Sequence, residues 1–280
     1  QNIIIRSSLF PGTCKMLYEK FCKKKGLLIS YCPERIVQGY SIKELKSLPQ
    51  IVGSNDIKAI NKSSKLFKKL TKKIITCDFE EAELAKLFNN SSRYIEFSIS
   101  NQFFMIASQF NTDFNKVRKI MAYGYKRGKL LPSPGFSAGP CLLKDTMQLY
   151  AAANQQYLLG FSAMNINEGL PNFIVNKILE KNSLKNKTVG IMGMAFKANV
   201  DDVRDSLSFK LKKILEFNGS KVVLTDPFVK HKDNVSLNLF LKKSKIIIIA
   251  TPHNKYRKIL FDRKTKVIDI WGITKHKFIL

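Results

Sequence analysis

Short apolar runs alternate with amphipathic stretches over the first 78 residues. Four runs have the length and the β-branched content of strands: residues 3–8, 27–31, 50–53 and 73–76. Thr13 follows a Pro-Gly break and is placed to cap a helix that extends to Phe21. Strands that alternate with helical stretches predict a parallel α/β sheet.

The apolar spacing changes at Glu80. From Glu80 to about Met121 apolar residues recur at steps of three and four, which predicts a helix. A Gly- and Pro-rich loop follows over residues 128–140, and the helical pattern resumes from Asp145 to Glu180. The middle of the chain is therefore predicted to be helical.

A second α/β pattern begins after Lys181. Residues 188–193 predict a strand that enters a turn, and residues 208–217 predict a helix. Three further strands are predicted at residues 221–225, 245–250 and 266–270. The pattern as a whole predicts an α/β protein in three parts, residues 1–78, 79–183 and 184–280.

Length and cysteine usage narrow the class of protein. A chain of 280 residues is long enough for two domains with a buried core. No apolar run approaches the ~18 residues of a membrane span, and the N-terminus does not resemble a signal peptide. The five cysteines are odd in number and no pair has metal-site spacing. We expect a cytoplasmic protein with no disulfide framework, no metal site and no membrane partner.

The chain is strongly basic. Lys and Arg total 48 against 21 for Asp and Glu, a net charge of +27. Such a charge suits a nucleic-acid binder, but the lysines are spread along the chain and no nucleic-acid motif accompanies them. Solvated faces are the favoured interpretation, with a positive field that attracts an anionic substrate such as a sugar diphosphate.

The first segment that suggests chemistry is Gly139-Pro140-Cys141-Leu142-Leu143-Lys144-Asp145. If a helix begins near Asp145, Cys141 lies at its N-terminus, where backbone N–H groups and the helix dipole favour a thiolate. Lys144 adds a cation, and Asp145 is suited to orienting a water. A thiolate attacks an aldehyde to give a thiohemiacetal, whose oxidation yields a thioester. The alternative is a buried structural cysteine in a turn.

Two further segments carry polar groups in ordered positions. Lys86, Asn90 and Arg93 are spaced to share one helix face, either as a substrate-binding set or as a solvated stripe. Glu34, in Ser30-Tyr31-Cys32-Pro33-Glu34-Arg35-Ile36, follows a strand. That position is the carboxyl edge of a parallel sheet, where ligands bind, although an ordinary turn fits as well.

A fourth segment starts at Gly190 and reaches Ser206. A glycine turn after a strand suits a phosphate when a cation follows it, here Lys197. Phe196 is suited to stacking on a base or a ribose. A Gly-x-x-Gly turn alone is weak support, but the longer string Phe196-Lys197 through Arg204-Asp205-Ser206 is informative.

Together these segments resemble, in order and local spacing, the UDP-glucose/GDP-mannose dehydrogenase family. Within that family of nucleotide-sugar 6-dehydrogenases they are most similar to the UDP-N-acetyl-D-mannosamine dehydrogenase branch. The resemblance runs from about Ile3 to Gly272 and includes Ser8 in Arg6-Ser7-Ser8-Leu9-Phe10-Pro11-Gly12-Thr13. It implies a Rossmann-like NAD-binding part (1–78), a central helical dimerisation domain (79–183) and a Rossmann-like UDP-binding domain (184–280).

The resemblance also implies residue roles. Cys141 would be the nucleophile, Lys86 would stabilise charge on the sugar C6 oxygen, and Asn90 would hydrogen-bond the sugar region. Asp145 with Ser8 would position the water for thioester hydrolysis, and Glu34 would act as an acid/base or orienting group. Substrate contacts would come from Arg35, Ile36, Arg93, Arg127, Phe196 and Lys197. Ser8, Glu34 and Arg204 would contact NAD.

The implied reaction is the oxidation of a UDP-hexose C6 alcohol to a carboxylate by two NAD molecules. A homodimer through the central helices is expected, with Phe103, Phe104, Ile106 and Phe110 as candidate contacts, although core packing is the first expectation for these residues.

Three positions and the start of the chain depart from the family pattern. Gln38 stands where a second acidic residue is common, Ala138 replaces a common Gly, and Trp271 stands where some members have a basic residue. No Gly-x-Gly-x-x-Gly precedes residue 1 and no initiator Met is present, which predicts an N-terminally truncated chain. The alternative function is therefore a catalytically incompetent UDP-sugar-binding or dimerising remnant.

Overall fold

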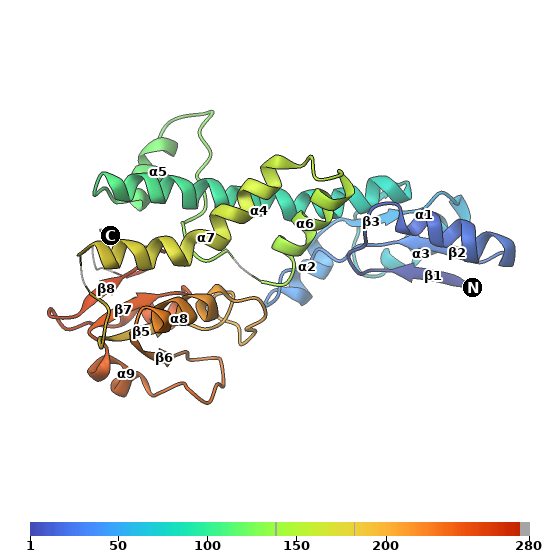
Figure 1. Cartoon of the computed structure of the whole chain (residues 1–280). Helices are drawn as coiled ribbons and strands as arrows, with labels where there is room; N and C mark the ends of the chain where they lie inside the picture. Colours follow the sequence, from blue (N-terminus) through green and yellow to red (C-terminus); the bar gives the residue numbers. More distant parts are fainter. Residues whose placement is uncertain (138, 182, 275–280) are drawn as a thin grey trace. The chain divides into compact units, whose positions relative to one another are not determined.

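The computed structural model describes residues 1–137, 139–181 and 183–274, so Ala138 lies outside the described residues. The chain divides into two compact units (Figure 1). Unit 1 combines Gln1–Ser92 with Lys144–Gly160, and unit 2 combines Arg93–Leu143 with Phe161–Leu280. The three-part division expected from the sequence stays a prediction.

The sheet of unit 1 has four strands in the order β1-β2-β3-β4. They are β1 (Asn2–Ile5), β2 (Leu28–Tyr31), β3 (Gln50–Gly53) and β4 (Ile74–Cys77). The β1–β2 and β3–β4 pairs are parallel as predicted, but β2 and β3 are antiparallel, joined at Tyr31 and Gly53. A parallel pair needs a crossover that packs on the sheet. The helix between β2 and β3, α2 (Ser41–Ser47), buries none of its residues and does not supply one.

The helix after β1 differs from the expectation at both ends. It is α1 (Thr13–Leu17), continued by a π turn (η1, Tyr18–Cys22) and a 3-10 turn (η2, Lys23–Lys25). Thr13 is not the cap, because Gly12 occupies that position with φ 85° and no side-chain cap. The Gly12 and Cys14 N–H groups donate instead to the buried carboxylate of Glu83 at 2.6 and 2.8 Å. A carboxylate at a helix N-terminus makes charge-assisted hydrogen bonds that a hydroxyl does not match.

Two longer helices complete unit 1. The helix α3 (Ile57–Phe67) is capped by Asp56, whose carboxylate accepts the Lys58 N–H at 2.7 Å. The helix α4 (Phe79–Gln109) starts in unit 1, where Phe79 and Ala82 pack into a core with residues of α1 and the sheet. The unit also contains most of α6 (Leu142–Ala152).

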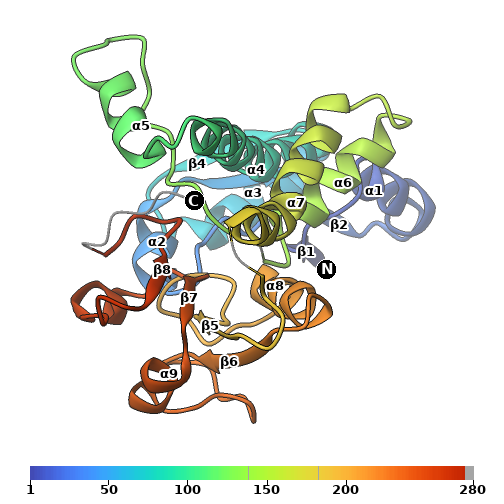
Figure 2. The same cartoon turned by 60° about the vertical axis from the view of Figure 1, so that its left-hand side comes forward.

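The sheet of unit 2 is fully parallel, in the order β6-β5-β7-β8. Its strands are β5 (Thr188–Met192), β6 (Lys221–Thr225), β7 (Ile246–Ile249) and β8 (Lys266–Ile268), which confirms the predicted strands within two residues. Alternate strand residues face opposite sides. One side packs on α8 (Leu207–Phe217) and the other on α9 (Leu237–Lys243), so the sheet is covered on both faces (Figure 2).

The helical part of unit 2 contains the end of α4, α5 (Phe114–Ala122) and most of α7 (Leu158–Lys181). The predicted long helices are interrupted at Asn111 and at Asn154-Gln155, which have positive φ. The α4 and α7 helices pack through Phe104 and Phe173, whose ring centroids lie 6.2 Å apart. Among the described residues, no helix is long and apolar enough to cross a membrane.

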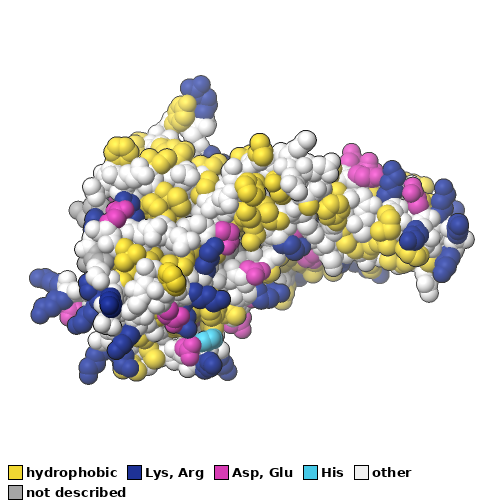
Figure 3. Space-filling model, in the orientation of Figure 1, with side chains coloured by type: hydrophobic (Ala, Val, Ile, Leu, Met, Phe, Trp, Pro, Cys, Tyr) yellow, Lys and Arg dark blue, Asp and Glu magenta, His cyan; other side chains and the backbone are white. Residues whose placement is uncertain are grey.

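Lys and Arg side chains are distributed over the surface of both units. On the face drawn in Figure 3 they lie at many separate places and form no single continuous stripe. The run Lys23–Lys25 illustrates the pattern, because all three lysines are exposed in a short turn. This distribution agrees with the interpretation of the lysines as solvated faces.

Candidate functional site

Three predicted residues of unit 1 meet at one carboxylate. Asp145 lies in the first turn of α6 with a fully buried side chain. Its Oδ2 accepts a hydrogen bond from Asn90 Nδ2 at 2.6 Å and one from Ser8 Oγ at 3.4 Å. Lys144 Nζ lies 2.8 Å from Oδ1. The fold thus joins residues from the loop after β1, from α4 and from α6, which are as far as 137 positions apart.

Glu34 lies at the carboxyl end of β2, next to that of β1. Its Oε1 accepts the N–H groups of Arg35 and Ile36 at 2.8 and 3.0 Å, and its Oε2 pairs with Arg6. Arg35 also donates to the Pro49 carbonyl. Glu34, Arg35, Ile36 and Pro49 are among the residues that line a cavity of about 10 Å³, which has room for a single water. Glu34 therefore lies at the edge of the sheet where ligands bind in such folds, but both of its carboxylate oxygens already bind neighbouring groups of the chain.

The Lys86–Asn90–Arg93 set is only partly an inward-facing group. Asn90 is buried and Lys86 is half-buried one turn before it, whereas Arg93 is exposed. Lys86 and Asn90 belong to unit 1 and Arg93 to unit 2. Arg127, also in unit 2, is exposed and stacks on Tyr125 with its guanidinium 5.2 Å from the ring centre. Asn90 is therefore not part of a solvated stripe, whereas the side chain of Arg93 is accessible to solvent.

Cys141 is exposed and directly precedes α6, which excludes a buried structural cysteine. The described part of the loop before it, residues 131–137 with 139–140, is named the cysteine loop. Gly139 has φ 109°, and a Cβ there would lie 2.6 Å from the Phe196 ring. Only glycine fits this position, because the ring occupies the space of a side chain and the backbone is left-handed. The cysteine loop is thus seated against the segment that carries Phe196 and Lys197.

Arg204 is exposed and lies in the segment that follows Phe196 and Lys197. Its guanidinium donates to both carboxylate oxygens of Asp202, at 2.7 to 3.1 Å. These hydrogen bonds and the charge of Asp202 raise the pKa of the exposed Arg204. Asp202 also fixes the segment by accepting the Phe196 N–H at its carbonyl, at 3.0 Å.

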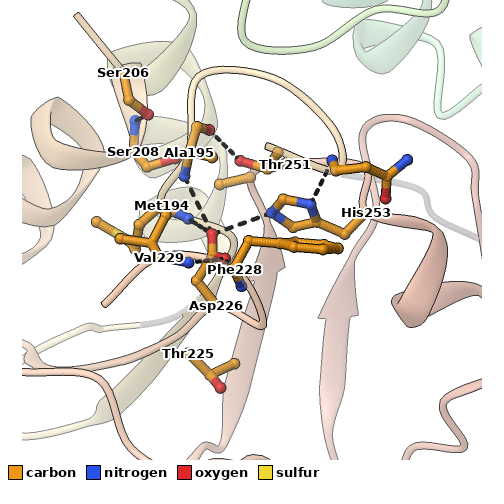
Figure 4. Close-up of polar contacts among 12 residues, drawn as sticks. Met194, Ala195, Ser206, Ser208, Thr225, Asp226, Phe228, Val229, Thr251 and His253 are labelled. Carbon is orange, nitrogen blue, oxygen red and sulfur yellow. Dashed lines mark hydrogen bonds and ion pairs between the residues drawn. The ribbon is translucent and has the colours of Figure 1, made fainter. Parts of the chain in front are cut away.

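A buried network follows β5 and β6 of unit 2 (Figure 4). Asp226 Oδ2 accepts the N–H groups of Met194 and Ala195, at 2.7 and 3.2 Å, and lies 3.1 Å from His253 Nε2. His253 Nδ1 accepts the Asn199 N–H at 2.9 Å, so the ring proton is on Nε2 and is donated to Asp226. The Asp226 and His253 side chains are fully buried.

This network changes the interpretation of the glycine turn at Gly193. The sequence suggested a phosphate cradle, but the Met194 and Ala195 N–H groups are already satisfied by Asp226. Burial alone would raise the pKa of Asp226. Hydrogen bonds from His253 and from backbone N–H groups outweigh that effect and lower its pKa to about 2. An ionised internal carboxylate therefore takes the place at the turn that a phosphate would occupy.

Sequence reasoning missed Glu83, Asp226 and His253 as ordering residues. For Asp226 the available signal was an Asp-Pro step directly after a predicted strand. Glu83 lies on α4, three positions before Lys86, and its hydrogen-bond partner Gly12 is 71 positions away in the sequence. No local pattern connects residues at that separation.

The two sheets and their helices define the structural class of the chain. A parallel sheet covered on both faces, together with helices and a second α/β sheet, makes the chain a mixed α/β protein with Rossmann-like, nucleotide-binding architecture. Two sequence matches then identify the family. Residues 80–168 match the central domain of the UDP-glucose/GDP-mannose dehydrogenase family, and residues 190–276 match its UDP-binding domain. The chain belongs to this family, which confirms both the predicted family and the α/β fold class.

Individual relatives cover nearly all of the chain. A UDP-N-acetyl-D-mannosamine dehydrogenase of Methanocaldococcus jannaschii is 29% identical over 99% of this chain and 65% of its own length. One from Pyrococcus horikoshii is 28% identical over 99% of this chain and 68% of its own. The chain thus spans about two thirds of the length of these curated relatives.

Solved structures give the same similarity. A UDP-D-ManNAc dehydrogenase from Pyrococcus horikoshii superposes with a TM-score of 0.86 at 27% identity, covering 99% of this chain and 67% of that one. The UDP-N-acetyl-mannosamine dehydrogenase Cap5O of Staphylococcus aureus gives a TM-score of 0.85 at 22% identity, covering 99% and 69%. At that identity the second comparison supports the fold alone.

Proposed function

We propose that the chain takes part in the NAD-dependent oxidation of a UDP-hexose, with UDP-N-acetylmannosamine as substrate, from the C6 alcohol to the carboxylate. The observation that carries the proposal is an exposed cysteine directly before a helix whose first turn holds the buried, hydrogen-bonded carboxylate of Asp145. The named relatives at 28–29% identity support the choice of substrate.

Cys141 is the nucleophile in this proposal. The sugar aldehyde that forms from the C6 alcohol is attacked by the Cys141 thiolate, and the new C–S bond gives a thiohemiacetal whose oxyanion the Lys86 ammonium stabilises. Removal of a hydride from that carbon leaves a thioester. A water held by Asp145 and Ser8 then attacks the thioester, the C–S bond breaks, and the carboxylate and the thiol are released. Because the sugar stays bonded to sulfur, no free aldehyde escapes between the two oxidations.

NAD, when bound, accepts the hydride at each oxidation. Ser8 and Glu34 follow the carboxyl ends of the adjacent parallel strands β1 and β2, which is where ligands bind in α/β sheets, so they fit the nicotinamide end. Arg204 is exposed and fits a diphosphate. The N-terminus of α1 does not fit one, because Glu83 already accepts two of its N–H groups. Glu34 orients the reacting groups or exchanges a proton once its Oε2 leaves Arg6.

The substrate contacts and the dimer are proposed on the same basis. Phe196 and Lys197, half-buried after the Gly193 turn, would hold the UDP, and Arg35, Ile36, Arg93 and Arg127 would line the sugar site. A homodimer would form through the C-terminal end of α4, where Phe103 and Ile106 are exposed by 37 and 43% and Phe110, directly after the helix, by 73%. Phe104 is not part of this surface, because it is buried in the core of unit 2.

The test is an assay of NADH formation by the chain with a panel of UDP-hexoses, combined with calorimetric titration of each sugar. We expect UDP-N-acetylmannosamine to give two NADH per carboxylate formed. UDP-sugar binding with no NADH formation would support the alternative function of a non-catalytic binding protein. If the chain neither binds a UDP-sugar nor forms NADH, both the proposed function and the alternative function are contradicted.

A further inference from the structure

The cysteine loop has no regular secondary structure, yet it leads directly to Cys141. It follows α5 and belongs to unit 2. Its first part is held by Arg118, which donates to the Leu131 carbonyl at 2.7 Å and to Ser133 Oγ at 2.8 Å. Its last part is seated by Gly139 on Phe196. Between these two anchors, the fixed point of the loop is Gly135.

Asn101 holds both backbone groups of Gly135. Its Oδ1 accepts the Gly135 N–H at 2.8 Å and its Nδ2 donates to the Gly135 carbonyl at 3.1 Å. The same Nδ2 donates to Asn167 Oδ1 at 2.8 Å, and Asn167 in turn donates to the Tyr94 carbonyl at 3.0 Å. Both amides are fully buried. A buried amide with all these partners has one orientation only, so Asn101 presents a fixed template to the loop.

Trp271 excludes any side chain at Gly135. Gly135 has φ 153°, and a Cβ there would lie 2.4 Å from two atoms of the indole. The indole is itself fixed, because Nε1 donates to the Ala250 carbonyl at 3.1 Å and the ring packs against the core. The position where some family members have a basic residue is thus occupied by a ring that contacts the cysteine loop.

We propose that Asn101 and Trp271 are positioning residues that clamp Gly135 and thereby set the conformation from which Cys141 acts. Neither side chain touches the reacting atoms, so both act through the loop. The proposal rests on the proposed function for its catalytic consequence only. The clamp itself is a property of unit 2 and is testable without turnover.

The direct test is hydrogen exchange in the intact chain with Asn101→Ala. Losing both hydrogen bonds to Gly135 should accelerate amide exchange in peptides covering residues 131–140 by about tenfold or more. Peptides from β5, β6 and β7 should exchange within twofold of the wild-type rate. Trp271→Leu is the second variant, for use if Asn101→Ala does not fold. It opens space over Gly135 while leaving the Asn101–Asn167 pair intact, and it should accelerate exchange in the same peptides.

The catalytic readout separates positioning from simple stabilisation. Well below the unfolding temperature, the variants should lower kcat about tenfold or more, since a misplacement of about 1 Å can cost ~100-fold, while KM for the UDP-sugar stays within threefold. Asn172→Ala, an exposed amide on α7, is the matched control and should change neither readout.

Two results would overturn the clamp: exchange that is unchanged in the cysteine loop, or exchange that rises uniformly across unit 2. A normal kcat with faster loop exchange would overturn its positioning role. If the wild-type chain forms no NADH, the proposed function fails, and the exchange data alone decide the clamp.

Discussion

Asp145 is the residue on which the proposed chemistry converges, because Asn90 and Ser8 both donate to the same oxygen, Oδ2. Two donors to one carboxylate oxygen fix the orientation of that group. An orienting base of this kind matters most in the step that uses water. Removing the charge of Asp145 should therefore slow thioester hydrolysis specifically.

Asp145→Asn should therefore slow the second half of the reaction more than the first. Loss of a general base costs roughly 100- to 10,000-fold in rate. A sugar adduct on Cys141 should accumulate in the variant and be visible by intact-mass spectrometry after mixing with UDP-sugar and NAD. Equal losses in both half-reactions with no adduct would contradict the assigned role.

Asp226 predicts a pH dependence of stability. Its pKa is about 2 in the folded chain against an ordinary value of 3.8, so the folded state binds the proton less tightly. The stabilisation, of about 2 kcal/mol, is present above pH 4 and is lost as the pH falls from about 4 to 2. Urea unfolding of the wild type and of Asp226→Asn at several pH values should show a difference that shrinks over this range. A pH-independent difference would contradict the account.

At the scale of elements, α1 depends on α4 for its N-terminus. The Gly12 and Cys14 N–H groups have no partner within their own short helix, and Glu83 of α4 supplies the acceptor. The same buried carboxylate raises the pKa of the Cys14 thiol, in addition to the larger effect of burial. The loop containing Ser8 leads into this turn, so its position depends on Glu83.

Glu83→Gln should lower the free energy of unfolding by about 2 kcal/mol, because a charge-assisted, buried pair of hydrogen bonds is weakened. The matched control is Glu80→Gln on the same helix. Glu80 makes only a surface ion pair with Lys15 at 3.4 Å, and exposed pairs contribute about 0–1 kcal/mol. Equal effects of the two substitutions in denaturant unfolding would disprove the role of Glu83.

For the whole molecule, the sequence predicted the features that follow from the local apolar pattern or from short sequence motifs shared with the family. The strands of unit 2, the fold class and the meeting of Ser8 with Asp145 follow from these signals. The antiparallel pairing of β2 with β3 does not, because an apolar run carries no strand direction. The contacts of Glu83, Asp226 and Asn101 join segments 27 to 71 residues apart, and spacing within one segment holds no information about them.

Assembly is also a property of the whole molecule. If α4 forms the dimer contact, Phe110→Asp should shift the chain from dimer to monomer in sedimentation velocity, since an apolar side chain that is 73% exposed becomes a charge in the interface. Phe217→Asp is the control, because Phe217 is 90% exposed on α8. Identical sedimentation of wild type and Phe110→Asp would contradict the proposed interface.

The central claim is that Cys141 bonds covalently to the substrate. The most direct measurement compares wild type with Cys141→Ser, recording NADH formation from UDP-N-acetylmannosamine and binding of the UDP-sugar by calorimetry. The account predicts that Cys141→Ser forms no carboxylate product while it still binds the UDP-sugar. Undiminished carboxylate formation by Cys141→Ser would contradict it.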